Sequence, residues 1–302
     1  LLRPSSLVRV VGAATATTVT LTEPDGGTVP RISVEPHYLE VLGHVDGKTT
    51  TLVGQRFEID ETASNLAAPG TLVLEADSPL NTSAGAVIAQ LVNYRVAIRP
   101  HWTLAALFGT GLQAKVNAAA AVAAADQVLA WDGDSYAVYY LRSGEVPQWR
   151  NVATGPTNQD QAIVPPGTGV FFRRQANALA FSVVGEVRVT PFARVPAKPA
   201  QLMATGFPVD ASPVDWQMVS SSLTAGTSPA TADQLLVWGD SAFQVFYLRQ
   251  GSALEWRNIA TGLTDYANAK LFRAKGAVLL RLQAGASGTA PFPLVQAVPF
   301  AP

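Results

Sequence analysis

The chain has 302 residues, of which 14% are charged and 48% are apolar, and its formal net charge is −1. A chain of this length is typical of two or three domains, and the near-neutral charge excludes the basic footprint of a nucleic-acid-binding protein. The sequence contains no cysteine, which excludes disulfides and thiolate sites, and no apolar run approaches the length of about 18 residues that a membrane span needs.

Residues 1–100 consist of short β-branched and apolar runs separated by turn residues. Asp46 followed by Gly47 is a hairpin signal. Roughly six or seven strands at this spacing predict a small β-barrel or sandwich. The predicted strands are 7–11, 17–22, 38–42, 50–53, 56–59, 71–75 and 86–98.

Residues 113–125 are the strongest helix candidate, because alanine has the best intrinsic helix propensity. The matching residues 220–231 of the later copy are rich in serine, threonine, glycine and proline and do not favour a helix. The prediction of one or two helical turns in the first copy therefore stays open.

The most informative pattern is an internal duplication. Residues 125–158 match residues 232–265 at a constant offset of 107 without a gap, and 17 of these 34 positions are identical. Such self-similarity is the mark of a repeated structural unit. We therefore predict an all-β chain with an N-terminal small β-barrel or sandwich (1–100) followed by two homologous tandem β domains (101–195 and 196–302).

Each copy is predicted to be built from strands. In the first copy these are 127–131, 136–141, a strand beginning at Trp149, 170–174, 181–184 and 187–190. Asp132-Gly133-Asp134 connects the first two as a hairpin turn. The proline-rich stretch 193–199 is predicted to link the copies in a semi-extended form.

A family resemblance covers most of the chain. The run Arg99-Pro100-His101-Trp102-Thr103-Leu104, followed by Phe108, Ala-Asp-Gln…Trp, Tyr-Leu, Trp-Arg, Pro-Gly-x-Gly and Arg173-Arg174, resembles an uncharacterised family of secreted β-rich proteins from Verrucomicrobia. The segment 38–104 is similar to it as well. The resemblance implies export and a β-rich fold and carries no known activity or site residue. The second copy departs from the pattern, because it lacks the arginine pair and the Pro-Gly-x-Gly turn.

The inventory of catalytic and metal-binding residues is thin. His37, His44 and His101 have no metal-site spacing. Asp132 and Asp134 resemble half of a calcium loop, but the second copy keeps only one of these carboxylates, so a hairpin turn is the favoured interpretation.

Carboxylate pairs give no better signal for catalysis. Glu58 with Asp60, or Glu145 with Asp134, would be candidates for a glycosidase pair, but no pattern places either pair across a cleft. We expect no enzyme activity, no cofactor and no metal.

The repeated aromatic and arginine residues allow two interpretations. Exposed tryptophans can stack on sugar rings and form a carbohydrate platform, whereas duplicated aromatics are also what a duplicated core requires. We favour the core, and we expect each arginine to be held by a carboxylate or by backbone carbonyls of its own copy. The predicted repeat-core residues are Trp131, Trp149, Arg150, Trp238, Trp256 and Arg257.

The predicted function is structural. Low charge, abundant small and β-branched residues and two apolar chain ends suggest a subunit of an extracellular filament or surface assembly that polymerises with copies of itself through β-strand contacts. Because the chain begins at Leu1 rather than methionine, we expect a processed form whose export signal has been removed. The alternative function is a secreted carbohydrate- or surface-binding tandem β module.

The segment 1–11 is the favoured donor strand, ahead of 290–301, which contains Pro291 and Pro293. Burying about six apolar side chains at roughly 1.5–3 kcal/mol each would give a gross gain near 10 kcal/mol, less the ordering cost. The assembly candidates are Leu1, Leu2, Leu7, Val8, Val10 and Val11.

Overall fold

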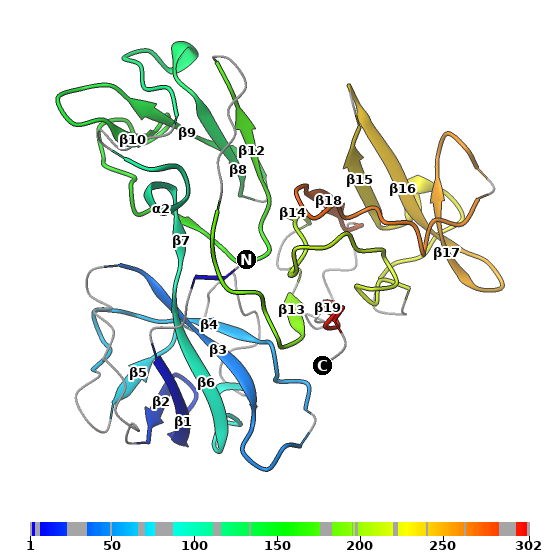
Figure 1. Ribbon diagram of the computed structural model, residues 1–302. Helices are drawn as coiled ribbons and strands as arrows, with labels where there is room; N and C mark the ends of the chain where they lie inside the picture. Colours follow the sequence, from blue (N-terminus) through cyan, green and yellow to red (C-terminus); the bar gives the residue numbers. More distant parts are fainter. Residues whose placement is uncertain are drawn as a thin grey trace.

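The fold is all-β, as the sequence predicts. A computed structural model describes residues 2–3, 7–22, 35–48, 50–65, 70–75, 87–110, 116–132, 134–175, 183–194, 196, 199–219, 223–239, 241–262, 264–283 and 294–300. The N-terminal residues form a six-stranded sheet. Figure 1 shows this sheet at the lower left, the sheet of the first copy above it and the sheet of the second copy beside them. Among the described residues, no helix is both long enough and apolar enough to cross a membrane.

The N-terminal domain is a single antiparallel sheet that curls on itself. Its strand order is β4-β3-β6-β1-β2-β5. A bridge between Ile59 and Leu74, the residues that directly follow β4 and β5, joins the two edges of the sheet. The six strands are β1 (Leu7–Ala14), β2 (Thr18–Leu21), β3 (His37–His44), β4 (Arg56–Glu58), β5 (Thr71–Val73) and β6 (Tyr94–Pro100).

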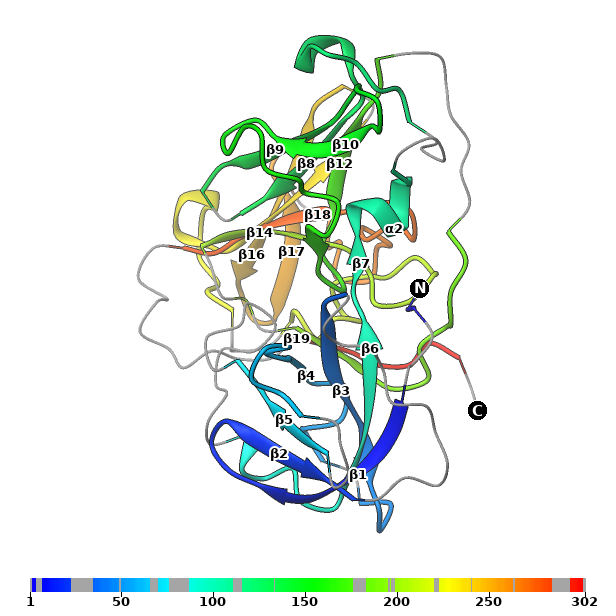
Figure 2. The same ribbon diagram turned by 90° about the vertical axis from the view of Figure 1, so that its left-hand side faces the viewer.

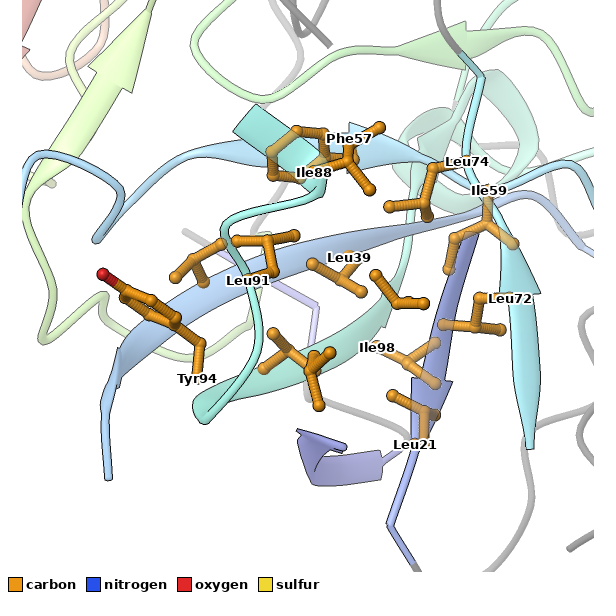
Figure 3. Close-up of a cluster of buried hydrophobic side chains, with 14 of the residues drawn as sticks. Leu21, Leu39, Phe57, Ile59, Leu72, Leu74, Ile88, Leu91, Tyr94 and Ile98 are labelled. Atoms are coloured by element: carbon orange, nitrogen blue, oxygen red, sulfur yellow. The ribbon is translucent and has the colours of Figure 1, made fainter. Parts of the chain in front are cut away.

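Alternate residues of these strands fill the interior of the curled sheet. Leu39, Phe57, Leu72 and Ile98 have no exposed surface or almost none, and Figure 3 shows them pointing toward one another. Each such side chain contributes about 1.5–3 kcal/mol on burial. The period-2 pattern of the sequence therefore gives the domain its core.

Two predicted strands of this domain are wrong. Residues 50–53 form a turn that runs into Gly54, whose φ of +85° is unavailable to an extended strand. The predicted strand 86–98 begins only at Tyr94, because Asn93 has a φ of 66°. The predicted turn Asp25-Gly26-Gly27 lies outside the described residues.

The N-terminal segment is an internal strand and offers no free edge. Leu7–Val10 pair with β6, and Val11–Ala14 pair with β2. Leu7 and Val11 are buried in the domain's own core, whereas Val8 and Val10 keep some exposure on the other face. The donor-strand hypothesis for Leu7, Val8, Val10 and Val11 is therefore wrong. Leu2 is buried and pairs with Glu186 of the same chain, and Leu1 lies outside the described residues.

The two copies fold into corresponding sheets. The first has the order β10-β9-β8-β12, and the second has β17-β16-β15-β18 with β14 added beside β18. The strands of the first copy are β8 (Gln127–Trp131), β9 (Tyr136–Arg142), β10 (Gln148–Asn151) and β12 (Val170–Arg173). Those of the second are β14 (Ala200–Met203), β15 (Gln234–Trp238), β16 (Phe243–Gln250), β17 (Leu254–Asn258) and β18 (Val278–Arg281).

Helical structure is short and is not where the alanine-rich stretch predicts it. The helix α2 (Leu104–Phe108) follows the two-residue strand β7 (Trp102–Thr103), which pairs with β11 (Ile163–Val164). Within the described part of 113–125, only the 3₁₀ turn η2 (Val122–Ala124) forms, and η3 (Pro229–Thr231) stands at the matching place in the second copy. The turn thus belongs to both copies, and alanine content does not decide it.

Extended segments join the three domains. Figure 2 shows β6 leading into β7 and α2, so that the N-terminal domain continues directly into the first copy. β14 pairs with β18 and also bridges to Thr168 just before β12, so it connects both copies. The closing segments of the copies pair with each other as β13 (Phe192–Arg194) and β19 (Leu294–Gln296).

Candidate functional site

A group of buried charges occupies the junction between the N-terminal domain and the two copies. We call it the junction cluster, and it has Glu40 at its centre. This carboxylate has no exposed surface, accepts a hydrogen bond from Arg99 Nε at 2.6 Å and forms an ion pair with Arg188. Thr190 Oγ1 donates to its other oxygen at 3.3 Å. The members of the cluster are Glu40, Arg56, Glu58, Arg99, His101, Arg188 and Phe192.

Two guanidinium groups pack against the ring of Phe192. Arg56 is 4.2 Å from the ring centroid and Arg188 is 5.0 Å from it. Arg56 also donates to the carbonyls of Pro166 at 3.1 Å and Ala193 at 2.6 Å. Burial lowers the pKa of both arginines to about 10, so both stay charged at neutral pH. These cation–π contacts, with the hydrogen bonds of Arg56, hold three segments of the chain together.

A second acid–base pair completes the cluster. His101 Nε2 lies 2.5 Å from Glu58 Oε2, and the imidazole ring packs 4.7 Å from the ring of Tyr38. His101 and Tyr38 are almost entirely buried. Groups withheld from solvent in this way are suited to joining domains and poorly suited to acting on a substrate.

One member of this cluster, Glu40, stands in the sequence within an apolar run, and the alternation of that run suggests an exposed position for it. Tyr38, Leu39, Glu40 and Val41 form an almost wholly buried run in β3, with Leu39 and Val41 in the barrel core. Period-2 alternation places Glu40 on the opposite face, which the pattern alone assigns to solvent. The junction covers that face instead. The strand predicted at 187–190 is also wrong, because Arg188 and Thr190 turn into the junction as irregular backbone.

Trp149 and Trp256 are buried core residues. Neither indole has exposed surface. The indole N–H of Trp149 donates to the Gly109 carbonyl at 2.9 Å, and that of Trp256 donates to the Met218 carbonyl at 3.1 Å. The corresponding residues thus serve the same purpose in both copies.

Trp131 and Trp238 are not core residues, and this part of the core prediction is wrong. Both stand at the end of the first hairpin strand, where the strand leaves the sheet. Trp131 is partly buried, and its indole N–H donates to the Ala200 carbonyl of β14 at 2.9 Å. Trp238 is 52% exposed. The copies therefore place the same residue in different environments.

The partner of each of these tryptophans is also duplicated. Tyr136 packs edge-on to Trp131 at 4.7 Å, and Phe243 packs edge-on to Trp238 at 4.9 Å. Phe243 is 37% exposed, whereas Tyr136 is partly buried. We call Trp238 and Phe243 the exposed aromatic pair. In the first copy, Trp131 contacts β14 of the neighbouring copy, and Tyr136 packs against Phe171 of its own copy.

The two repeated arginines are held differently. Arg257 donates from Nε to Glu255 at 2.9 Å, forms an ion pair with it, and donates to the Gly262 carbonyl at 3.3 Å. Arg150 donates to the side-chain oxygen of Gln148 at 2.8 Å. No carboxylate pairs with Arg150 in the part of the chain that the structure describes.

Arg150 lines an open cleft of about 390 Å³ on the first copy. The cleft lies at the β9–β10 hairpin and at the turn that follows β10. Two of its seven lining residues are arginines, and none of them is acidic. The lining residues are Arg142, Ser143, Gly144, Val146, Gln148, Arg150 and Pro156.

Two of the carboxylates considered as catalytic, Glu58 and Asp60, have structural partners. Glu58 pairs with His101, and Asp60 accepts hydrogen bonds from the backbone of its own turn, from Thr62 and Ala63. Asp132 accepts from the backbone N–H groups of Asp134 and Ser135, which is the geometry of a hairpin turn. Among the described residues, no three His, Asp or Glu side chains gather in a way that could hold a metal ion.

Comparison of the chain with protein-family models, curated proteins and solved structures gives no match. The resemblance to a secreted family therefore remains a prediction.

Proposed function

We propose that this chain is a structural subunit that associates with copies of itself in an extracellular filament or surface assembly, with no catalytic role. The observation that carries the proposal is that the aromatic pair, which both copies have at the same hairpin, has different surroundings in the two copies. In the first copy, Trp131 of the aromatic pair at the hairpin donates a hydrogen bond to a strand of the next copy. In the second copy, the exposed aromatic pair covers no strand of the described chain.

The contact in the first copy indicates what the exposed pair would bind. Trp131 donates to a backbone carbonyl of β14, and β14 also exchanges backbone hydrogen bonds with residues 167–169 of the first copy. Such a contact needs only an extended strand with an available carbonyl, so many strands could satisfy it. We propose that a strand of a second copy of this chain takes that place over Trp238 and Phe243.

A head-to-tail contact of this kind joins unlike surfaces and does not close on itself unless its rotation allows a ring. It therefore favours an extended polymer. It also replaces the terminal donor strand as the proposed means of assembly, because β1 is paired on both sides within its own sheet.

The experiment compares the wild type with a Trp238→Ser, Phe243→Ser double variant by light scattering coupled to size exclusion over a concentration series. We expect the wild type to gain mass with concentration and the variant to stay monomeric. Because both side chains are exposed, the variant should keep its fold, which circular dichroism checks. A wild type that stays at 31.7 kDa at every concentration, or a variant that associates equally well, overturns the proposal.

The second candidate is a secreted module that binds carbohydrate, and the same exposed aromatic pair favours it, since an exposed indole can stack on a sugar ring. The buried Trp149 and Trp256 cannot contribute to such a platform. Tryptophan fluorescence that responds to a neutral oligosaccharide in a monomeric wild type, and does not respond in the double variant, would select this function instead.

A further inference from the structure

We propose that the cleft at the β9–β10 hairpin of the first copy binds an oxyanion group, such as a carboxylate, sulfate or phosphate, of an acidic ligand. This inference is independent of assembly, because it concerns the other copy and other residues. It depends on how the two copies differ at one position.

The strand register brings the polar residues of the cleft together. Gln148 lies directly opposite Arg142, and Arg150 is two residues further along the same strand. Residues so placed share one face of a sheet. Leu141 and Trp149, which alternate with them, are fully buried on the other face. The side chains of Arg142 and Arg150 therefore leave the sheet on the face opposite to Leu141 and Trp149.

Neither arginine has a counter-ion in the described structure. Arg150 has one neutral partner, the side-chain oxygen of Gln148, and its Nε is buried without a hydrogen-bond partner. No side-chain hydrogen bond or ion pair is made by Arg142 within the described ranges, and its side chain is exposed. Two positive charges thus border one cleft with their charge uncompensated.

The second copy shows what these arginines do when an anion is present. Arg249, Glu255 and Arg257 stand at the places of Arg142, Gln148 and Arg150. The Oε2 atom of Glu255 accepts hydrogen bonds from both Nε and Nη2 of Arg257, which is a charge-assisted ion pair through one carboxylate oxygen. The second copy therefore carries its oxyanion as a side chain. The first copy has the same basic residues and lacks that carboxylate.

The acidic residue of the first hairpin, Glu145, does not line the cleft. It is in the loop between β9 and β10 and is exposed. The second copy has Ser252 at that place. The hairpins thus have the same net charge, but only the second has its carboxylate between the arginines.

The rest of the cleft suits the remainder of an organic acid. Val146 is 61% exposed and Pro156 is exposed, so they offer an apolar wall beside the guanidinium groups. The hydroxyl of Ser143 adds a polar contact on the lining. Arginine is suited to carboxylate, sulfate and phosphate because its planar fork of donors matches their paired oxygens.

The test titrates the full chain with sodium acetate, sulfate and phosphate separately at constant ionic strength, and follows the amide NMR signals of residues 142–156. We expect saturable shifts confined to this hairpin in the wild type. In Gln148→Glu, which supplies the internal carboxylate of the second copy, we expect affinity to fall on the order of tenfold or more. Glu145→Gln is the matched control and should retain the binding.

The reverse substitution in the second copy, Glu255→Gln, tests the same idea by removing the internal carboxylate. Glu255→Gln should create a second site, seen as new shifts in residues 249–262. A wild type that binds none of the anions more tightly than about 10 mM, or a Gln148→Glu variant that binds as well as the wild type, overturns the proposal. Titration with a uronic-acid oligosaccharide and with its neutral counterpart then separates a saccharide-borne carboxylate from a free anion, and equal binding of both also counts against the site.

Discussion

At the scale of single residues, the molecule depends on charges that are buried in pairs. Glu40 is surrounded by Arg99 and Arg188, which come from opposite sides of the domain boundary. Removing one partner of a buried pair leaves the other charge desolvated and uncompensated, which costs far more than the pair contributes. Without Glu40, the buried charge of Arg188 would lose this counter-ion and would destabilise the fold.

We predict that Glu40→Gln lowers the free energy of unfolding by about 3–5 kcal/mol. Urea denaturation followed by fluorescence measures this change. Asp46→Asn is the control, because Asp46 and its partner Lys48 are well exposed and such pairs contribute little. Equal stability of the two variants would contradict the assignment of Glu40 to a buried ion pair.

His37 gives the fold a predictable sensitivity to acid. Burial lowers its pKa below the ordinary value of 6.5, against the opposing effects of the Glu35 carbonyl and of the Glu35 and Glu61 carboxylates. The folded state then binds fewer protons than the unfolded state, so stability falls as the pH drops below about 6.5. Between pH 7.5 and 5.5, the unfolding midpoint in urea should fall further in the wild type than in His37→Gln. Parallel pH profiles would show that His37 does not contribute.

At the scale of elements, glycines mark where one segment crosses another at close range. A Cβ at Gly54 would stand 1.9 Å from the Pro191 carbonyl oxygen, and its φ is +85°. Gly167 and Gly206 would both collide with the ring of Phe192. The turn before β4, the turn before β12 and the segment after β14 thus all approach Pro191 and Phe192 at the start of β13.

Gly54→Ala should therefore destabilise the junction beyond the cost of its backbone conformation alone. Gly47→Ala is the matched control, because Gly47 has a φ of +71° and open space around its Cβ position. A non-glycine residue in this region costs about 1–2 kcal/mol, and we expect Gly54→Ala to exceed its control clearly in thermal unfolding. If the two variants have the same melting temperature, segments 54 and 191 do not touch in solution.

The sequence predicts the duplicated strands and their core, but not which segments of the chain pack against each copy. Corresponding strands and the buried Trp149 and Trp256 follow from the repeated pattern, because packing is repeated with the fold. The different positions of Trp131 and Trp238 do not follow, because Trp131 meets the carbonyl of Ala200 in β14, whereas Trp238 is 52% exposed. A local sequence pattern does not predict contacts with residues that are distant in the chain.

The junction cluster could not be predicted for the same reason. Glu40 and Arg188 are 148 residues apart, and the sequence around either residue does not indicate the ion pair.

The donor-strand prediction for the N-terminal segment is wrong for a related reason. Its apolar residues predict burial, and β1 is buried, but the sequence cannot say whether the covering sheet belongs to the same chain.

At the scale of the whole molecule, extended segments and buried charges join the three domains at one place, and the second copy leaves its aromatic pair exposed. The exposed pair stands at the hairpin position that meets β14 in the first copy, and this is the reason we connect the architecture with assembly.

Negative-stain electron microscopy of the wild-type protein at high concentration tests the central claim most directly. We predict elongated particles or filaments with a regular axial repeat, and their loss in the Trp238→Ser, Phe243→Ser double variant. Monodisperse single particles of the wild type, unchanged across concentration and indistinguishable from the variant, would contradict the account.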